Sequence, residues 1–531
     1  MKYLKSLLSF LPLSAVLFSS SFILVSFFHN IGELSLSEIT IPSVAAVIFA
    51  FIVYLLSLPL MKNREKGKVF SSFFIIIFFS YIGIFSLLGN IPIKSDLFVD
   101  NKSHFALAIC FILFLLTFLF VRRLKTRLIL LNRFLLLIAL IITFLNIFQI
   151  GHYEISQRQE TGPQSPLVLP DINESEFNRN KLPDIYFILP EDYSAPSVLK
   201  QYFNYDSTGF LDFLKDKKFY IASESASNYP KSFLSITSML NMEYLDYLSK
   251  YKNSGDQTLV STLIENNNFL RLIRELGYGY YQMGSWWGPT HFNPLADDNF
   301  IIEKENIGSI DDFSYTILES SILRPLIIRY LPRNVITESI EDKRKRILYQ
   351  FRELPEVAKL PGPKFVFTHI IAPHGPYVFD RNCQNIGPRK TLKKTETENY
   401  TNQVNCINLK IEDVINTILK ESPRPPVILL ETDEGAPFLG EKVIPADSWS
   451  KATTDLLKEK FPIFAAYYLP GVSHKSLYPA ISPVNSLRLI SNLYFKTDFP
   501  ILPDKNYIFP DMKHLYQFKD VTDEVKSVNN N

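Results

Sequence analysis

Acidic, hydroxyl and imidazole side chains follow short apolar runs at several widely separated points of the chain. Glu191 comes after DIYFIL, Ser232 lies between NYPK and the apolar run FLSITSML, and His374 follows KFVFTHIIAP. Asp433 and Glu434 come directly after PVILLET. Carboxylates together with one hydroxyl suit a divalent cation, because hard cations prefer oxygen ligands and lower the pKa of a hydroxyl that they contact. The pattern favours metal-assisted attack by a serine oxygen on a phosphorus or sulfur centre.

Each of these residues has a place in that chemistry and also an ordinary structural interpretation. Ser232 would be the nucleophile, since a helix N-terminus stabilises an alkoxide and a bound anion, but it could equally be a simple N-cap. His374 could hydrogen-bond a non-bridging oxygen or protonate the leaving group. His369, inside an apolar run, is more simply a hydrogen-bonded core histidine. The joint placement favours the functional interpretation.

Four further residues are candidate substrate contacts. Lys231 directly precedes Ser232, and Tyr377 lies in the run HGPY after His374. Trp287 and His291 both fall in the run GSWWGPTH, where they could line a substrate cleft. Packing is the competing explanation for the tryptophan.

Short apolar runs alternate with helical patterns in the second part of the chain. Strands are predicted over 184–189, 218–222, 278–283, 364–370, 426–431 and 464–469, and helices over 258–276, 402–420 and 484–495. Continuous apolar strands alternating with amphipathic helices predict an α/β fold, a mostly parallel sheet with helices on both faces. Ligands bind at the carboxyl ends of such strands, so the polar groups that follow them should meet at one rim.

The first part of the chain has the sequence pattern of a membrane anchor. Five apolar runs without Asp or Glu cover 7–28, 39–61, 69–91, 105–121 and 128–150. About 20 residues cross a bilayer, so four of the runs are long enough and 105–121 is marginal. We therefore predict an all-α five-span transmembrane region over 1–150, a polar linker over 151–182 and an outer domain over 183–531.

Charge predicts the orientation of the anchor. Ten Lys and Arg residues lie before the first run or after the second and fourth, whereas the loops on the other side hold only Lys94 and Lys102. Basic loops stay in the cytoplasm, which predicts an inner-membrane, multi-pass protein with a cytoplasmic N-terminus and a periplasmic or extracellular C-terminal domain. A cleaved signal peptide is the alternative for the first run. The spans carry almost no ionisable residues, which disfavours a transporter.

Charge and cysteines constrain the outer part further. Residues 1–150 hold 13 Lys and Arg and 5 Asp and Glu, which leaves 42 basic and 48 acidic residues for the remainder. An acidic domain without a basic stripe excludes nucleic acid as a partner. Cys383 and Cys406 lie 23 positions apart, and an oxidising location favours a disulfide, with two buried free thiols as the alternative.

Taken as a set, the motifs PED, NYPKS, GSWWGPT, HIIAPHGPY and TDEG resemble the alkaline phosphatase/sulfatase superfamily. The five-span anchor with an outer domain is similar to that of lipoteichoic acid synthases and phosphoethanolamine transferases. The resemblance implies an alkaline-phosphatase-like domain with Glu191, Ser232, Asp433 and Glu434 as metal ligands, Ser232 as covalent nucleophile and His374 as substrate contact. It also implies one divalent cation, Mn²⁺, Mg²⁺, Zn²⁺ or Ca²⁺, and a phosphate or sulfate ester, such as a lipid head group or envelope glycan, as substrate.

Two departures from the family pattern matter. Relatives commonly have Asp-His-Gly where this chain has Asp433-Glu434-Gly435. The site therefore gains a negative charge, and its metal preference should shift from Zn²⁺ toward harder ions. Ser232 lacks the context for conversion to formylglycine, because Phe233 follows it without the required proline and arginine. The first hypothesis is therefore a membrane-anchored, metal-dependent hydrolase or transferase with a covalent serine intermediate. The alternative is a catalytically inactive envelope protein with a degenerate metal site.

Overall fold

The computed structural model describes residues 11–29, 39–89, 102–125, 128–159, 165–170, 181–302, 312–330, 340–386, 394–436 and 448–526. The chain forms two compact units. The first contains Met1–Glu160 and Asn306–Ser339, and the second contains Thr161–Glu305 and Ile340–Asn531. The segment Asn306–Ser339 thus groups with the N-terminal helices, whereas its position in the sequence assigned it to the outer domain.

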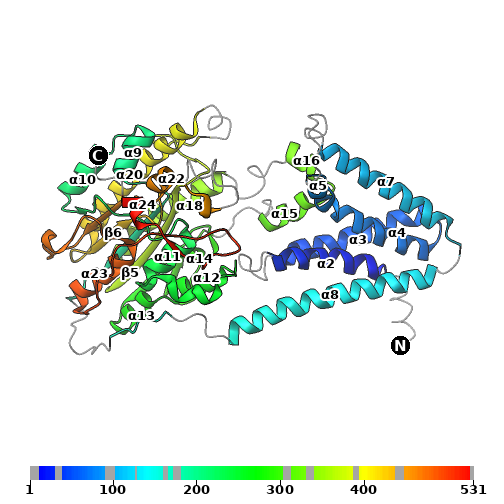
Figure 1. The fold of residues 1–531 in the computed structure, drawn as a ribbon, viewed down its shortest axis with the longest axis horizontal. Helices are drawn as coiled ribbons and strands as arrows, with labels where there is room; N and C mark the ends of the chain where they lie inside the picture. The colour runs from blue at the N-terminus through cyan, green and yellow to red at the C-terminus, as the bar shows by residue number, and fades with distance from the viewer. Residues whose placement is uncertain are drawn as a thin grey trace. The chain divides into compact units, whose positions relative to one another are not determined.

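The described residues of the first unit form helices joined by short turns, with no strand among them. Its helices are α2 (Leu13–His29), α3 (Thr40–Met61), α4 (Arg64–Phe79), α5 (Tyr81–Gly89), α7 (Lys102–Arg123), α8 (Leu128–Gln159), α15 (Asp312–Ser320) and α16 (Arg324–Tyr330) (Figure 1). By length and composition α3, α7 and Leu128–His152 of α8 can cross a membrane, and α4 with α5 forms a fourth candidate bent by 45°. Helix α2 has 17 residues and is shorter than a span. The structure supports three or four spans among the described residues, and a count of five stays a prediction.

The helix α8 is longer than the apolar run that predicted it. It continues to Gln159, past Ile150, where the sequence suggested the start of a linker. The stretch from Gly151 to Gln159 contains no proline, and the next Gly-Pro pair is Gly162-Pro163. A polar stretch without a helix breaker can extend a helix that is already nucleated, because each added residue forms one more hydrogen bond.

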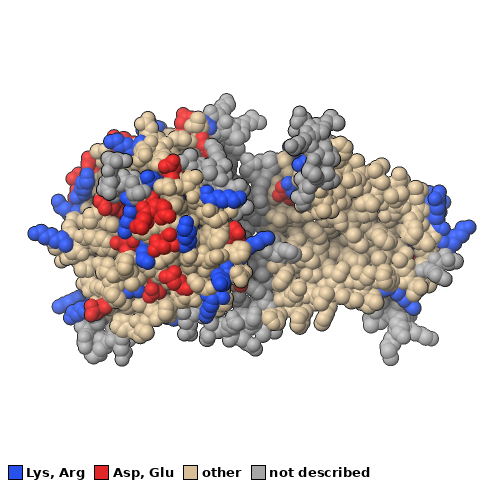
Figure 2. All heavy atoms as spheres, viewed as in Figure 1, with Lys and Arg blue, Asp and Glu red and all other residues tan. Residues whose placement is uncertain are grey.

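The visible face of the first unit is almost free of charge. Figure 2 shows it nearly all in the colour of uncharged residues, with Lys and Arg gathered at one end. Large apolar side chains lie on its outside, including Leu56 at 64%, Phe111 at 68% and Phe144 at 65% exposure. Apolar faces of this extent are what helices present to lipid.

The second unit contains a seven-stranded mixed sheet in the order β2-β7-β6-β1-β5-β3-β4. The strands are β1 (Ile185–Glu191), β2 (Tyr220–Ile221), β3 (Gly279–Met283), β4 (Asp298–Phe300), β5 (Lys364–Pro373), β6 (Val427–Glu431) and β7 (Ala465–Tyr468). Strand β7 runs antiparallel to both neighbours, and every other pair is parallel. The predicted α/β fold and all six predicted strands are confirmed. Strand β4 was missed because three residues, two of them polar, give no apolar pattern. A separate two-stranded sheet pairs β8 (Tyr507–Ile508) with β9 (Lys519–Asp520).

Helices cover both faces of the large sheet (Figure 1). One core packs α20 and α10 against Ile188 and Val366, and the other packs α11, α13 and α23 against Phe187 and Phe367. The helices of this unit are α9 (Pro196–Phe203), α10 (Thr208–Asp216), α11 (Ser232–Asn241), α12 (Thr258–Glu265), α13 (Asn268–Glu275), α14 (Gly288–His291), α18 (Ile340–Glu353), α20 (Glu396–Glu421), α22 (Thr454–Lys460), α23 (Pro483–Phe495) and α24 (Thr522–Lys526). Short 3₁₀ helices are η3 (Leu245–Tyr251), η4 (Glu356–Lys359), η6 (Trp449–Lys451) and η7 (His474–Ser476).

The helix predicted over 258–276 is two helices, α12 and α13. The side chain of Asn267 accepts a hydrogen bond from the backbone N–H of Leu270 at 2.8 Å and so caps a new helix start. Asparagine at this position competes with the backbone for hydrogen bonds, which ends one helix and begins the next.

The helix α20 is held at both its start and its middle. Thr395 and Glu398 form a capping box at its N-terminus. A disulfide joins Cys406 in the helix to Cys383, so the pairing favoured by an oxidising location is present. The bond ties the loop after His374 to the helix.

Candidate active site

The neighbouring strands β1 and β5 each place one polar group on the same face of the sheet. Side chains alternate along a strand, and Phe187 of β1 and Phe367 of β5 lie in the same core cluster. Glu191 and His369 continue these two alternations at the carboxyl ends of neighbouring strands. Both therefore lie on the face that α11 covers.

Glu191, His369 and Asp433 form a compact buried group. One ligand atom from each lies within 4.8 Å of the other two. Their side chains leave Oε2, Nε2 and Oδ2, respectively, buried and without a hydrogen-bond partner. Buried polar atoms are nearly always hydrogen-bonded, and unpaired ones cost free energy, so three that face one another indicate a place for an ion.

Ser232 contacts this group from the start of α11. It is the first residue of the helix, and its Oγ donates a hydrogen bond to Glu191 Oε1 at 3.1 Å. The preceding loop is fixed by Asn228, whose side chain donates to the Lys505 carbonyl at 2.9 Å and accepts from the Val484 N–H at 2.8 Å. The serine oxygen is thus held in place by elements far away in the sequence.

His369 is oriented by a short hydrogen-bond chain. Its Nδ1 lies 2.8 Å from the Thr290 hydroxyl, which in turn lies 2.7 Å from the Ser285 hydroxyl. Its Nε2 lies 3.9 Å from Glu191 Oε2. Burial, with the charge of His374 as a smaller cause, lowers the pKa of His369 to about 3, so the imidazole is neutral. The sequence suggested a core histidine; the ring is buried, but its free nitrogen faces the acidic group.

Burial changes the acidity of the carboxyl groups. It raises the pKa of Glu191 to about 8, with the nearby charge of Asp192 as the second cause. It raises the pKa of Asp433 to about 7, with the charge of Glu191 as the second cause. Raised values of this kind are expected where carboxylates share a dry site without a counterion.

A buried lysine neutralises the remaining acidic residues. Lys460, the last residue of α22, places Nζ 3.1 Å from Glu434 Oε1 and 3.4 Å from Asp192 Oδ1. It also donates to the Gly435 carbonyl at 2.6 Å. A Cβ on Gly435 would lie 2.6 Å from the Lys460 carbonyl, so only glycine allows this approach. One oxygen of Glu434 is therefore engaged with Lys460, and Glu434 as a metal ligand stays a prediction.

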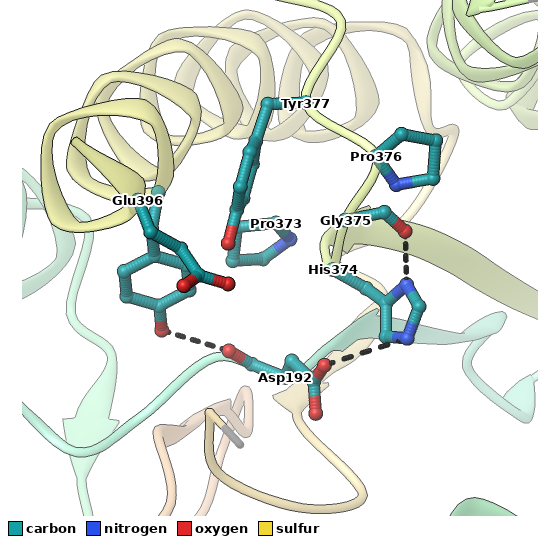
Figure 3. Close-up of a pocket in the computed structure, with 8 residues that line it drawn as sticks. Asp192, Pro373, His374, Gly375, Pro376, Tyr377 and Glu396 are labelled. Carbon is teal, nitrogen blue, oxygen red and sulfur yellow. Dashed lines mark hydrogen bonds and ion pairs between the residues drawn. The ribbon is translucent and has the colours of Figure 1, made fainter. Parts of the chain in front are cut away.

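His374 lies beside this cluster at the edge of a cavity. Its Nε2 is 3.7 Å from Asp192 Oδ2, and its Nδ1 contacts the Gly375 carbonyl. Lys343 of α18 donates to the His374 and Gly375 carbonyls at 2.8 and 3.0 Å. The cavity, of 270 Å³, is lined by Asp192, Pro373, His374, Gly375, Pro376, Tyr377, Glu396 and Tyr400 (Figure 3).

Figure 3 shows the Tyr377 hydroxyl and the Glu396 carboxylate directed toward the middle of this cavity. Tyr377 was proposed as a substrate contact from the sequence, and its place in the cavity beside His374 supports that role. Trp287 and His291 lie on the loop that supports His369: the indole ring centroid is 5.9 Å from that of the imidazole, and His291 Nδ1 lies 2.5 Å from the Ser285 carbonyl. Lys231 is the N-cap residue of α11, next to Ser232. These substrate-binding roles stay predictions.

Sequence reasoning missed Lys460 and Lys343 and undervalued His369. Lys460 and Lys343 lie on helices whose sequences are strongly charged, and nothing in those sequences distinguishes a buried lysine from a solvated one. The position of His369 in the sequence was informative. His369 follows Phe367 by two residues, so both side chains lie on the same face, and it lies near the carboxyl end of the predicted strand over 364–370, which pairs with the strand that contains Glu191.

No family model and no curated protein sequence matches the chain. Solved structures are similar to it. The C-terminal periplasmic domain of EcEptC from Escherichia coli, in complex with Zn, is 13% identical with a TM-score of 0.41, covering 68% of this chain and 99% of that one. The lipooligosaccharide phosphoethanolamine transferase A (EptA) from Neisseria meningitidis, an integral membrane protein, is 14% identical with a TM-score of 0.37, covering 91% and 95%.

A 2-O GAG sulfatase, BT1596, is also similar, with 11% identity, a TM-score of 0.38 and coverage of 64% of this chain and 76% of that one. Phosphoethanolamine transferases and sulfatases are the groups that the motifs of this chain resemble.

Proposed function

We propose that the protein is a membrane-anchored, metal-dependent enzyme that transfers or hydrolyses a phosphate or sulfate ester through a covalent intermediate on Ser232. One observation carries the proposal. The Ser232 hydroxyl lies 3.1 Å from Glu191 in a buried group with three unpartnered ligand atoms. A serine at a helix N-terminus beside such a group has both an acceptor for its proton and a site for the anion that it attacks.

The donor set fits a divalent cation. Glu191, His369, Asp433 and the Ser232 oxygen would supply three oxygens and one nitrogen, a mixed set that suits Zn²⁺ or Mn²⁺ better than Ca²⁺. When bound, such an ion lowers the pKa of the serine hydroxyl and screens the charge of the ester oxygens. The imidazole that relatives take from Asp-His-Gly would here come from β5.

The residues of the chain account for the chemical steps. The Ser232 hydroxyl passes its proton toward Glu191 Oε1 as the oxygen forms a bond to phosphorus or sulfur, and the bond from that centre to the alcohol oxygen breaks. His374, 37% exposed at the mouth of the cavity, passes a proton from Nε2 to the departing alcohol when its ring is protonated. Burial lowers the pKa of His374, so this step is favoured at acidic pH. Water or an acceptor hydroxyl then attacks the phosphorus or sulfur centre of the serine ester and passes its proton to His374. The bond from that centre to Ser232 Oγ breaks, and Oγ recovers its proton from Glu191.

Charge compensation makes an anionic substrate acceptable. Four carboxylates, those of Glu191, Asp192, Asp433 and Glu434, lie in or beside the site, and Lys460 pairs with two of them. Lys343, 4% exposed, places a second ammonium group beside His374. Fixed cations in a buried site stabilise the charge that develops during transfer.

A lipid head group or envelope glycan is the proposed substrate class, and the periplasmic or extracellular face of the inner membrane the proposed location. The apolar helices of the first unit support the proposed substrate class, because a membrane anchor brings the site to substrates that stay at the membrane. The basic loops between those helices support the proposed location.

The test uses the full chain in detergent with an aryl phosphate and an aryl sulfate, each with added Mn²⁺, Zn²⁺ or Mg²⁺. Ser232→Ala should lower turnover at least about 1,000-fold, since the nucleophile cannot be replaced by the residues that remain. Ser261→Ala, a serine in α12 whose Oγ only bonds the Gln257 carbonyl, is the matched control and should keep full turnover. Turnover by Ser232→Ala equal to that of the control contradicts the mechanism.

Metal binding is measured separately by elemental analysis. His369→Gln should lower the bound metal at least about tenfold, whereas His474→Gln, in the 3₁₀ helix η7, should leave it unchanged. A wild-type chain that holds no metal and gains no thermal stability from any of the three ions would instead identify an inactive, sulfatase-like envelope protein.

A further inference from the structure

The segment containing α15 and α16 lies in sequence between strand β4 and helix α18, both of the second unit, yet it belongs to the first. Phe313 and Ile317 of α15 are 4% and 6% exposed. They lie in one cluster with Phe27 of α2 and Phe78 of α4. The rings of Phe27 and Phe313 meet edge to face at 6.4 Å. Helix α15 is thus packed on the apolar helices as part of their own core.

A second set of contacts fixes the turn between α15 and α16. The backbone N–H of Ile322 donates to the Phe78 carbonyl at 3.0 Å, just before the bend between α4 and α5. The guanidinium of Arg324 lies 5.2 Å from the Phe85 ring centroid and pairs with Glu319 at 3.4 Å. Helix α16 therefore starts from a fixed point at the ends of these helices.

The contacts also show which ends these are. Phe27 lies near the end of α2, and Ile150 of α8, in the same cluster, lies at the end of the apolar run 128–150, which follows the basic residues Arg122 to Lys125. With the basic turns in the cytoplasm, both ends are at the opposite face of the membrane. The segment accordingly lies at the level where the outer leaflet meets water.

Helix α16 presents apolar side chains outward at that level. Leu323, Leu326 and Tyr330, spaced by three and four residues, are 36%, 56% and 65% exposed. Leu323 directly precedes α16, and Ile328 within the helix is also exposed, at 47%, whereas Ile327 is 6% exposed. Four exposed apolar side chains in or beside a helix of seven residues are costly to leave in water, at roughly 25 cal/mol for each Å² of apolar surface.

We propose that α16 is an interfacial helix that binds the outer leaflet of the lipid bilayer through Leu323, Leu326 and Tyr330. The helix is continuous with the apolar surface of the spans, and tyrosine and arginine are the residues that anchor helices at the level of lipid head groups. Arg329, exposed beside Tyr330, lies within reach of lipid phosphates. The inference is independent of the chemistry at Ser232.

The experiment places a fluorophore on Leu326→Cys and, separately, on Tyr330→Cys, each in a Cys110→Ser background in which the other two cysteines stay in their disulfide. The full chain is reconstituted into vesicles of phosphatidylethanolamine and phosphatidylglycerol with or without brominated acyl chains. Leu409→Cys on α20, with 43% of the leucine exposed, is the matched control.

We expect brominated lipid to quench both α16 positions at least about threefold more than position 409, and aqueous iodide to quench them at least about threefold less. Equal quenching by brominated lipid at the three positions overturns the proposal. Protection from iodide without quenching by brominated lipid also overturns it, because a protein surface, such as a second copy of the chain, would then cover the helix.

Discussion

At the scale of single residues, the site combines groups that are individually ordinary. A buried histidine, a serine that starts a helix and a carboxylate that ends a strand are common in α/β proteins. What distinguishes them here is that Glu191 Oε2, His369 Nε2 and Asp433 Oδ2 are all buried without a partner. This shared lack of partners supports a cation site and leads to two predictions.

The first concerns pH. Burial raises the pKa of Asp433 to about 7 and that of Glu191 to about 8, so in the metal-free protein the two groups favour folding while they are protonated. The metal-free protein should therefore lose stability as pH rises from about 4, where these carboxyls ionise in the unfolded chain, to about 8, and should lose no more from them above that pH. A divalent cation must displace these protons, so the Mn²⁺ concentration that gives half-maximal thermal stabilisation should fall more than about tenfold between pH 6 and pH 8.5. A midpoint that does not change with pH would show that these carboxyls do not bind the ion.

The second concerns Lys460. Removing one partner of a buried ion pair leaves the others charged and unpaired, at a cost of about 3 to 5 kcal/mol. Lys460→Met should therefore lower the free energy of unfolding, measured by chemical denaturation, by about 3 kcal/mol. The double variant Lys460→Met with Glu434→Gln should recover part of the loss, and Lys458→Met on the same helix should cost far less. A double variant as unstable as the single one would show that Glu434 is not the partner.

At the scale of elements, the neighbouring strands β1, β5 and β6 determine where the chemistry occurs. Their carboxyl ends lie side by side, and the alternation of side chains sends Glu191 and His369 to the face that α11 covers. Helix α20 supports the opposite face, and its disulfide restrains the loop that contains His374.

This disulfide gives a prediction for the element that it fixes. Cys383 and Cys406 are 23 positions apart, and closing a loop of this size removes entropy from the unfolded chain worth about 3 kcal/mol. Replacing both cysteines with serine should lower the free energy of unfolding by about that amount. A reductant should destabilise the wild-type protein to a similar extent and leave the serine variant unchanged. An equal effect of reductant on both proteins would show that the disulfide contributes no stability.

At the scale of the whole molecule, the chain joins an apolar helical unit to an α/β unit, and its charge is divided accordingly. The basic residues of the first 150 positions gather in the turns that we place in the cytoplasm, whereas the remainder is acidic. This division predicts which parts of the protein can be reached from outside the cell membrane.

The prediction is tested with single cysteines in a Cys110→Ser background. A membrane-impermeant maleimide should label Lys420→Cys in cells whose inner membrane is intact, because this exposed residue of α20 lies in the outer domain. It should label Lys125→Cys only after the membrane is permeabilised. Labelling in the reverse order would place the second unit in the cytosol and rule out an envelope substrate.

The sequence by itself determined the elements and the identity of most candidate residues. Short apolar runs that are rich in β-branched and aromatic residues favour buried strands, so six strands were predictable from local composition, as was the polar group after most of them. The proposed nucleophile Ser232 and the carboxylates Glu191 and Asp433 followed from their positions relative to those strands. The helix break at Asn267 and the grouping of α15 and α16 with the spans were not predictable, because neither has a distinct local pattern.

Only the tertiary structure decided how the charges are shared. Glu434 pairs with Lys460, which lies 26 residues further along the chain. His369, whose sequence context is that of a core residue, directs its free nitrogen at Glu191. The physical reason is that hydrogen bonds and ion pairs act over about 3 to 4 Å between atoms, whereas sequence patterns report only burial and periodicity along the chain. Which buried groups meet is fixed by strand order and helix packing, and these are properties of the whole fold.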